Sequence, residues 1–326
     1  MIDQANKPVL SAKQRKTVIF SLVLAAAVYL GIVIWSGYDN IWIAFQQIGS
    51  LGWALLLLCS LLNYLLRFIR WQGYIQQTGA CVPAGRHFLY YLAGFALTTT
   101  PGKAGETIRS VLLRPHGVRY PASLASFFSE RFLDVIVIAM LASLTVVAFE
   151  QYIVFVLIAT AVILLMLPLV RSPALISILG SLQNGVQRQK VKATFGHLIN
   201  LIRSAQLFLS WRGISSGLLL GFVAWSIQGL AFYFIVTTLN VEIGLLAAMG
   251  IYAVSLLAGA VSFIPGGVGS TEVVMGLLLS ALGADTSIAV SAPLISRLST
   301  LWFAVVLGLL SAAWLTRSNE QAPPPE

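Results

Sequence analysis

Long apolar runs separated by short polar segments occupy almost the whole chain. Six of these runs are long enough to cross a bilayer, because a spanning helix needs about 20 consecutive apolar residues. They lie at about residues 17–36, 50–69, 132–149, 151–170, 213–238 and 298–316. The pattern therefore predicts an all-α, polytopic membrane protein with about six full transmembrane helices.

Two further apolar regions are each interrupted in the middle by a Pro-Gly segment. The first runs from 87 to 113 with its break at 101–106, and the second runs from 245 to 282 with its break at 265–272. Proline and clustered glycines end helices, and each remaining piece is short for a span. We predict two re-entrant helical hairpins, although two full spans in place of either would leave the flanking segments on the same sides. The predicted break residues are Pro101, Gly102, Gly105, Pro265, Gly266, Gly267 and Gly269.

The two breaks resemble each other in sequence. One reads Pro-Gly-x-x-Gly-Glu and the other Pro-Gly-Gly-x-Gly-x-x-Glu, and an arginine follows each glutamate after 25 residues: Arg131 after Glu106, and Arg297 after Glu272. Each arginine is expected to open the next spanning helix. Three predicted spans separate the breaks, and an odd number inverts the second copy relative to the first. Interrupted helices in an inverted repeat are the best sequence indication of a transporter's substrate site.

The repeats set the predicted domain organisation. Repeat one covers about residues 50–149 and repeat two about 213–316, within a single transmembrane domain at 1–316. The connector at 171–212 has apolar residues at helical spacing and many basic residues. It is expected on the cytoplasmic side, either as amphipathic helices lying on the anionic leaflet or as a plain link. Residues 317–326 end in Pro-Pro-Pro-Glu and are expected to form a disordered tail.

Composition and charge agree with a membrane protein and predict its orientation. Only 10% of the 326 residues are charged and 58% are hydrophobic, whereas a soluble domain carries about 25% charged residues. The net charge of +9 would suggest a nucleic-acid partner for a soluble protein. Here it indicates orientation, because basic residues collect on cytoplasmic loops. With both the N- and C-termini in the cytoplasm, sixteen of the twenty Lys and Arg residues fall on that side, and we expect no nucleic-acid partner.

Charged residues also gather in and beside the two breaks, where the pattern places them inside the membrane. Ionisable residues there are costly and mark substrate or ion paths. Helices that begin after a break direct N–H groups toward it, which favours an anionic group such as a lipid phosphate. Alternatively, Glu106–Arg131 and Glu272–Arg297 are ion pairs that only hold the hairpins, and both interpretations can apply together. The predicted substrate-binding residues are Lys103, Glu106, Arg109, Glu130, Arg131, Asp134, Glu272 and Arg297.

No pattern typical of an enzyme accompanies these charges. His87, His116 and His197 lack the spacing of metal ligands. The sequence also has no nucleophile–base pattern, Walker loop or dinucleotide fingerprint. It therefore predicts no catalytic residue, no metal and no cofactor, and a protein that is not an enzyme.

Four motifs resemble a known family. They are Arg67-x-x-Arg70-Trp71, Thr100-Pro101-Gly102-Lys103-Ala104-Gly105-Glu106-x-x-Arg109, Glu130-Arg131-x-x-Asp134 and Pro265-Gly266-Gly267-Val268-Gly269-x-x-Glu272. Together they are similar to the transmembrane, flippase-like region of the lysylphosphatidylglycerol synthases, over about residues 17–316. The resemblance implies a protein of the bacterial cytoplasmic (inner) membrane that moves a phospholipid or related polar lipid between leaflets.

The resemblance is to a stand-alone member of that family. The synthases continue into a soluble aminoacyl-transferase domain, whereas this sequence ends at Glu326, so aminoacylation is not implied. Aminoacylated phosphatidylglycerol, a polyprenyl-linked sugar and a hopanoid-type lipid all stay open as substrates.

The breaks and the resemblance together favour a lipid flippase or transporter that moves a polar or anionic lipid. Its arginines would bind the head-group phosphate, Arg131 at an inner gate and Arg297 at an outer gate. Proton exchange on Glu106 or Glu272 would couple transport to the membrane potential. The alternatives are an anion channel or exchanger, and an accessory subunit that presents lipid to a separate lipid-modifying enzyme. The expected partners are membrane lipids, and homo-oligomerisation is left open.

Overall fold

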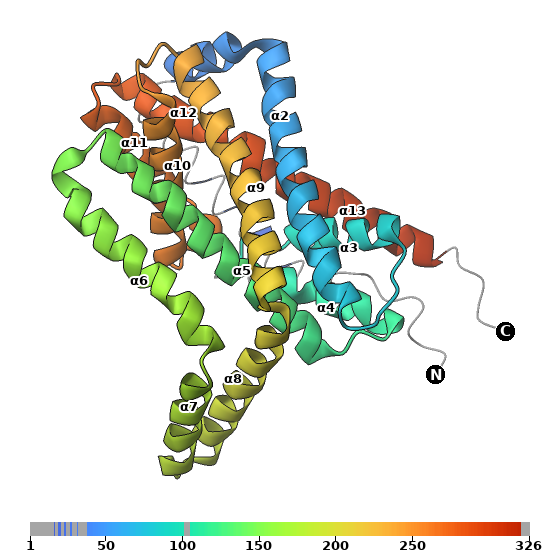
Figure 1. Ribbon diagram of the computed structural model, residues 1–326. Coiled ribbons are helices and arrows are strands. Elements are labelled where there is room, and N and C mark those ends of the chain that lie inside the picture. The colour runs from blue at the N-terminus through green and yellow to red at the C-terminus, as the bar shows by residue number, and fades with distance from the viewer. Residues whose placement is uncertain are drawn as a thin grey trace.

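The computed structural model describes residues 38–100 and 105–320, together with a few isolated positions between 16 and 31. In these residues the protein consists of helices joined by turns, without strands (Figure 1). The all-α prediction is therefore confirmed for the described part of the chain. The predicted first span at 17–36 falls almost entirely outside the described residues.

The part of the chain up to residue 142 contains the first break. Its elements are α2 (Tyr38–Gln76), α3 (Ala84–Phe95), α4 (Ile108–Leu113), the 3₁₀ turn η2 (Arg114–His116) and α5 (Tyr120–Ala142). The helices predicted on either side of the first break correspond to α3 and α4. Pro101, Gly102 and Lys103 lie between them, outside the described residues.

The middle of the chain forms a helical hairpin that extends from one end of the bundle (Figure 1). The turns η3 (Ser143–Val147) and η4 (Glu150–Tyr152) lead into α6 (Ile153–Arg171), α7 (Pro173–Gly185) and α8 (Gln189–Phe208). The chain bends by 77° between α6 and α7. Helices α7 and α8 pack on each other, and α8 also packs on α5. The predicted connector is therefore a pair of helices, and its contact with a leaflet stays a prediction.

The last part of the chain contains the second break. It forms α9 (Trp211–Thr238), α10 (Leu245–Val261), the turn η5 (Pro265–Gly267), α11 (Ser270–Ala281), α12 (Thr286–Arg297), the π-helical turn η6 (Leu298–Trp302) and α13 (Phe303–Glu320). Helices α10 and α11, on either side of the break, pack side by side. Helix α13 continues four residues into the predicted tail at 317–326, because no proline or glycine interrupts it before Pro323.

Three described helices are long and apolar enough to cross a membrane: Asp39–Gln76, Trp211–Thr238 and Thr286–Ser318. A fourth span is possible by length and composition if the bent pair Val156–Arg171 and Pro173–Gly185 crosses as one unit. The predicted spans at 50–69, 213–238 and 298–316 lie within the first three, and 151–170 lies in the region of α6. The count of six spans stays a prediction.

The expectation that Arg131 and Arg297 open spanning helices is wrong. Helix α5 begins at Tyr120, well before Arg131, and Arg297 lies inside the apolar helix Thr286–Ser318. Pro121 stands in the first turn of α5, where a residue without an N–H is tolerated. The charged side chains farther along α5 have buried partners, so the helix continues through them.

Helices α2 and α9 lie side by side and run in opposite directions (Figure 1). Side chains of α2 donate hydrogen bonds to main-chain carbonyls of α9 at three levels. As the donors advance along α2, their acceptors occur at decreasing residue numbers in α9, so the two helices are antiparallel. The bonds run from Gln47 Nε2 to Thr238 O (2.7 Å), from Asn63 Nδ2 to Ala224 O (2.8 Å) and from Arg70 Nη1 to Gly217 O (3.2 Å).

The largest apolar core lies where α2, α5, α9, α10, α11 and α12 meet. A second apolar cluster packs α3 against α2 and α13. Helix α2 contributes to both, and its arginines lie in the stretch that faces the second cluster. The candidate site therefore has apolar packing on either side, which keeps its charged groups away from solvent.

Candidate functional site

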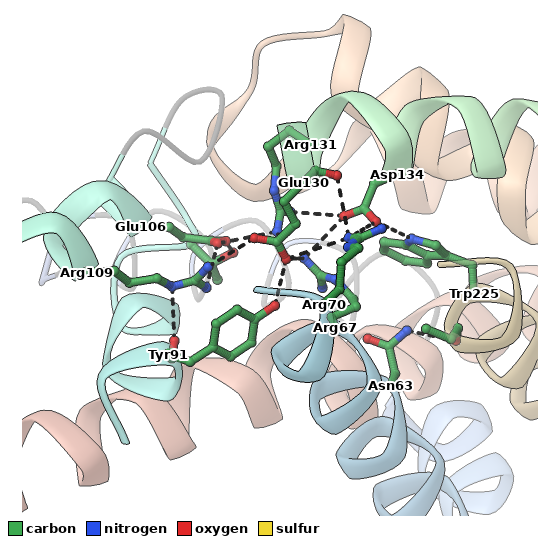
Figure 2. A network of polar contacts seen from close by, with 12 residues as sticks. Asn63, Arg67, Arg70, Tyr91, Glu106, Arg109, Glu130, Arg131, Asp134 and Trp225 are labelled. Carbon is green, nitrogen blue, oxygen red and sulfur yellow. Dashed lines mark hydrogen bonds and ion pairs between the residues drawn. The ribbon is translucent and has the colours of Figure 1, made fainter. Parts of the chain in front are cut away.

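Seven charged side chains meet in the interior and are called the buried charge cluster from here on (Figure 2). Helix α2 supplies two of them and α5 supplies three. One more lies in the turn before α4, and one lies in α4 itself. Six of the seven residues are at most 4% exposed, and the side chain of Arg131 is 18% exposed. The members are Arg67, Arg70, Glu106, Arg109, Glu130, Arg131 and Asp134.

Glu130 is the centre of the cluster. Its Oε1 accepts a hydrogen bond from the Tyr91 hydroxyl at 2.7 Å and lies 2.9 Å from Arg131 Nη2. Arg67 Nη2 donates to the same oxygen at 3.3 Å, and Arg109 Nη1 donates to Oε2 at 3.3 Å. A carboxylate surrounded by guanidinium groups is stable inside a protein only with such partners, so this glutamate holds α2, α4 and α5 together.

Asp134 connects the cluster to α9. It lies one turn after Glu130 on α5, and its Oδ1 accepts from Arg70 Nη2 at 2.6 Å and from Trp225 Nε1 at 3.1 Å. The guanidinium of Arg67 also lies over the ring of Trp225, 5.3 Å from the centroid, an arrangement that attracts a cation to an aromatic face. The second half of the chain therefore reaches the cluster through a tryptophan.

Glu106 is held by residues on both sides of the first break. Its Oε1 accepts from Thr98 Oγ1 at 2.8 Å, and its Oε2 lies 2.9 Å from Arg109 Nη2 and 3.7 Å from Arg131 Nη2. Arg109 reaches this position by passing over Gly94 of α3, where a Cβ atom would lie only 2.4 Å from its Nε. The predicted pair Glu106–Arg131 is thus present as one contact in a larger network.

The second break has its own, smaller arrangement. Arg297 Nε donates to Glu272 Oε1 at 3.0 Å, and its Nη2 donates to the main-chain carbonyl of Gly266. The main-chain N–H of Gly269 donates to Glu272 Oε2 at 2.8 Å. The backbone takes φ values of 65° at Gly266 and 90° at Gly269, a region that residues other than glycine rarely adopt. The glutamate and arginine therefore stabilise the break through its own backbone.

One cavity of about 240 Å³ is lined by arginines from both halves of the chain. Arg131 and Asp134 line it from α5, and Arg297 lines it from the end of α12. Most of the other lining residues are apolar, and Phe263 among them is 76% exposed. This cavity is called the two-arginine cavity below. It can hold an anionic group beside apolar chains.

The structure brings most of the predicted site residues together in two groups. Glu106, Arg109, Glu130, Arg131 and Asp134 belong to the buried charge cluster, and Glu272 and Arg297 form the pair at the second break. Gly105 and the glycines of the second break lie beside them, whereas Lys103, Pro101 and Gly102 are outside the described residues.

Sequence reasoning missed two arginines of the cluster. Arg67 and Arg70 lie at the end of the predicted span at 50–69 and are not among the predicted site residues, but α2 continues beyond them and both are buried. Their spacing of three residues places them on one face of a helix. Two arginines on one face at the end of an apolar stretch could have indicated a buried charged site. Tyr91 and Trp225 were missed as well, because neutral aromatic residues in apolar helices give no such signal.

Comparisons with known proteins point to one family. The family described as the lysylphosphatidylglycerol synthase TM region matches residues 18–308 of this chain. A UPF0104 membrane protein of Pyrococcus horikoshii is 26% identical over 282 residues, which cover 78% of this chain and 84% of that relative. A UPF0104 membrane protein of Methanothermobacter thermautotrophicus is 24% identical over 277 residues, which cover 77% of this chain and 81% of the relative.

A shorter similarity links the chain to an enzyme. A phosphatidylglycerol lysyltransferase of Staphylococcus xylosus is 31% identical over 97 residues, which are 30% of this chain and 12% of the enzyme. The match therefore concerns a small part of that longer protein.

Proposed function

Because the chain belongs to the family of the lysylphosphatidylglycerol synthase transmembrane region, we propose that it moves a polar or anionic lipid between the leaflets of a membrane. It is a membrane protein, and its matched relatives are also membrane proteins. We place it in the cytoplasmic membrane with both termini in the cytoplasm, as the distribution of basic residues indicates.

The two-arginine cavity is the observation that carries this proposal. A guanidinium group forms bidentate, charge-assisted hydrogen bonds with phosphate, and Arg131 and Arg297 both line the cavity. Its remaining walls are mostly apolar, as acyl chains require, and include Val135, Ile138 and Leu256. An amphiphile with a phosphate and hydrocarbon chains fits this combination better than a small ion does, because an ion gains nothing from apolar walls.

The proposed architecture is an inverted repeat of two interrupted helical hairpins within about six spans. The antiparallel pairing of α2 and α9 supports it, because each of these helices precedes one break. So does the recurrence of a Glu–Arg contact at each break, Glu106 with Arg131 and Glu272 with Arg297. Irregular backbone inside a membrane is tolerated where it is buried in protein or lines a cavity, and Gly266 and Gly267 line this one.

In this mechanism the two arginines exchange protein carboxylates for the lipid phosphate. Arg131 is the more accessible, since its side chain is 18% exposed, whereas that of Arg297 is 7% exposed. A phosphate entering the cavity would contact Arg131 first and Arg297 after the second pair opens. Glu106 and Glu272 compensate the arginines when lipid is not bound, so the site would alternate between internal ion pairs and lipid contacts.

Leaflet exchange of a fluorescent anionic phospholipid in proteoliposomes tests the proposal. We expect Arg131→Gln and Arg297→Gln each to slow exchange by about tenfold or more, since a charge-assisted hydrogen bond contributes about 1.5–3 kcal/mol. Arg188→Gln is the matched control, because Arg188 is exposed at the start of α8 and away from the cavity. Wild-type rates in both cavity variants would contradict a lipid path through this site.

Electrical recording of the same proteoliposomes separates the proposal from an anion channel or exchanger. Each lipid that crosses carries far less charge than an open anion channel passes in the same time. The proposal therefore predicts lipid movement without sustained chloride current. A current with no lipid movement would favour the channel. Lipid movement only after a lipid-modifying enzyme is added would favour an accessory subunit.

A further inference from the structure

A second, smaller cavity lies between the two halves of the chain, beside the two-arginine cavity. Its volume is about 70 Å³, and it shares Trp225 and Arg297 with its larger neighbour. Most of its exposed wall is apolar, and polar side chains line the rest. These polar side chains include Arg67, Thr98, Gln228 and Tyr252. It is called the small polar cavity below, and Arg67 of α2 and Arg297 of α12 both line it.

The charges around this cavity do not balance. The buried charge cluster contains four guanidinium groups, from Arg67, Arg70, Arg109 and Arg131, and three carboxylates, from Glu106, Glu130 and Asp134. Four minus three leaves one excess positive charge, and the neighbouring pair Glu272–Arg297 is balanced by itself. Burying an uncompensated charge is unfavourable, so a bound anion would stabilise this arrangement.

Two buried polar atoms of lining residues point to a ligand in the cavity. Arg67 is 4% exposed and its Nε has no hydrogen-bond partner among the described residues, although its Nη2 contacts Glu130 and Asp134. Gln228 is 3% exposed and its Oε1 also has no partner. Its Nε2 donates to the Cys59 carbonyl and to Ser60 Oγ, so the unpartnered Oε1 is an acceptor for a water molecule beside the anion.

The one carboxylate in the wall, Glu106, is already engaged. Thr98 donates to its Oε1, and Arg109 and Arg131 contact its Oε2. Its negative charge is therefore compensated by two guanidinium groups of the buried charge cluster. The two guanidiniums in the wall, with hydroxyl and amide groups beside them, leave the cavity with mainly hydrogen-bond donors.

Size selects the class of anion. A space of about 70 Å³ is less than a third of the roughly 240 Å³ of the two-arginine cavity. A chloride ion and one water fit in this space, whereas a glycerophosphate head group does not. We propose that the small polar cavity binds one monovalent inorganic anion of the size of chloride, between Arg67 of the first half and Arg297 of the second. This anion is resident and lies beside the proposed lipid path, with which it shares Arg297.

Thermal unfolding of the purified full-length protein in detergent tests this site without any transport assay. Unfolding is followed while sodium chloride replaces sodium gluconate at constant ionic strength. We expect the unfolding temperature to rise by about 3–8 °C and then to saturate, because a ligand that binds only the native state stabilises it. Bromide should act like chloride. Equal unfolding temperatures in chloride and gluconate, or a rise with inorganic phosphate alone, would overturn the proposal.

Variants locate the effect. Gln228→Leu fills the cavity with an apolar side chain and should abolish the saturable rise. Gln206→Leu is the control, since Gln206 is a partly buried glutamine that donates to the Val170 carbonyl away from the cavity. If Gln228→Leu does not fold, Tyr252→Phe removes one hydroxyl from the wall and should raise the chloride concentration needed for half the effect. The ³⁵Cl NMR linewidth of the wild type gives a second readout, and no broadening would contradict binding.

Discussion

The two Glu–Arg contacts beside the breaks have the same sequence spacing but different surroundings. In the first half, Arg131 lies 3.7 Å from Glu106, 2.9 Å from Glu130 and 3.7 Å from Asp134, so it is shared among three carboxylates. In the second half, Arg297 lies 3.0 Å from Glu272, and its Nη2 donates to the Gly266 carbonyl of the break. One contact is a member of a network, and the other is local to its break.

This difference indicates which half moves more easily. A displacement of the first break would have to separate charged groups from α2, α4 and α5 together. A displacement of the second break has to open one ion pair and a few bonds to the backbone of the break itself. We infer that the second half is the mobile gate and the first half is the fixed support, and three substitutions test this from the largest expected effect to the smallest.

Glu130→Gln should have the largest effect on stability. The substitution keeps the shape of the side chain but removes the charge that four guanidinium groups share. Breaking a buried ion pair by removing one partner costs about 3–5 kcal/mol, so we expect low yield and a strongly reduced unfolding temperature. Glu150→Gln is the control at an exposed position. A Glu130→Gln protein as stable as the wild type would show that the network does not support the first half.

Glu272→Gln should have a smaller effect. The amide oxygen can still accept from Arg297 Nε, and Arg297 keeps its bond to the Gly266 carbonyl. We expect a loss of about 1.5–3 kcal/mol, the range for hydrogen bonds to charged groups, measured by thermal unfolding in the same detergent. A loss equal to that of Glu130→Gln would remove the distinction between a fixed and a mobile half.

Gly269→Ala should have the smallest effect of the three. No atom lies within 4 Å of the added Cβ, so the cost comes only from the backbone φ of 90°. A residue with a Cβ in a left-handed conformation loses about 1–2 kcal/mol. Gly73→Ala is the matched control, because Gly73 also has open space around it but lies in the helical backbone of α2. Alanine there should be neutral or stabilising, and similar losses at both positions would contradict the role of φ.

Much of the second-half site could be predicted from the sequence. Proline and glycine act on the backbone where they stand, so the break at 265–272 with its glutamate could be placed from the sequence. Arg297 lies 25 positions beyond Glu272, and the repeated Glu–Arg spacing indicated their pairing. Local signals and the repeat were therefore sufficient for this region.

The network of the first half could be predicted only in part. Arg67 and Glu130 are 63 positions apart in the sequence. The periodic pattern of apolar residues does not predict a contact between residues so far apart. The same arginine fits the positive-inside pattern equally well as the cytoplasmic end of the predicted span at 50–69. The start of α5 was placed too late for a related reason, because hydropathy treats a buried, paired charge as a polar boundary.

The seam between α2 and α9 has a mechanical consequence. Its three side-chain bonds to carbonyls are separated along α2, at Gln47, Asn63 and Arg70. Sliding one helix along the other would break all three at once, whereas a small rotation about their common axis changes each bond only slightly. The seam therefore resists sliding of α2 along α9 more strongly than it resists a small rotation of one helix about the other.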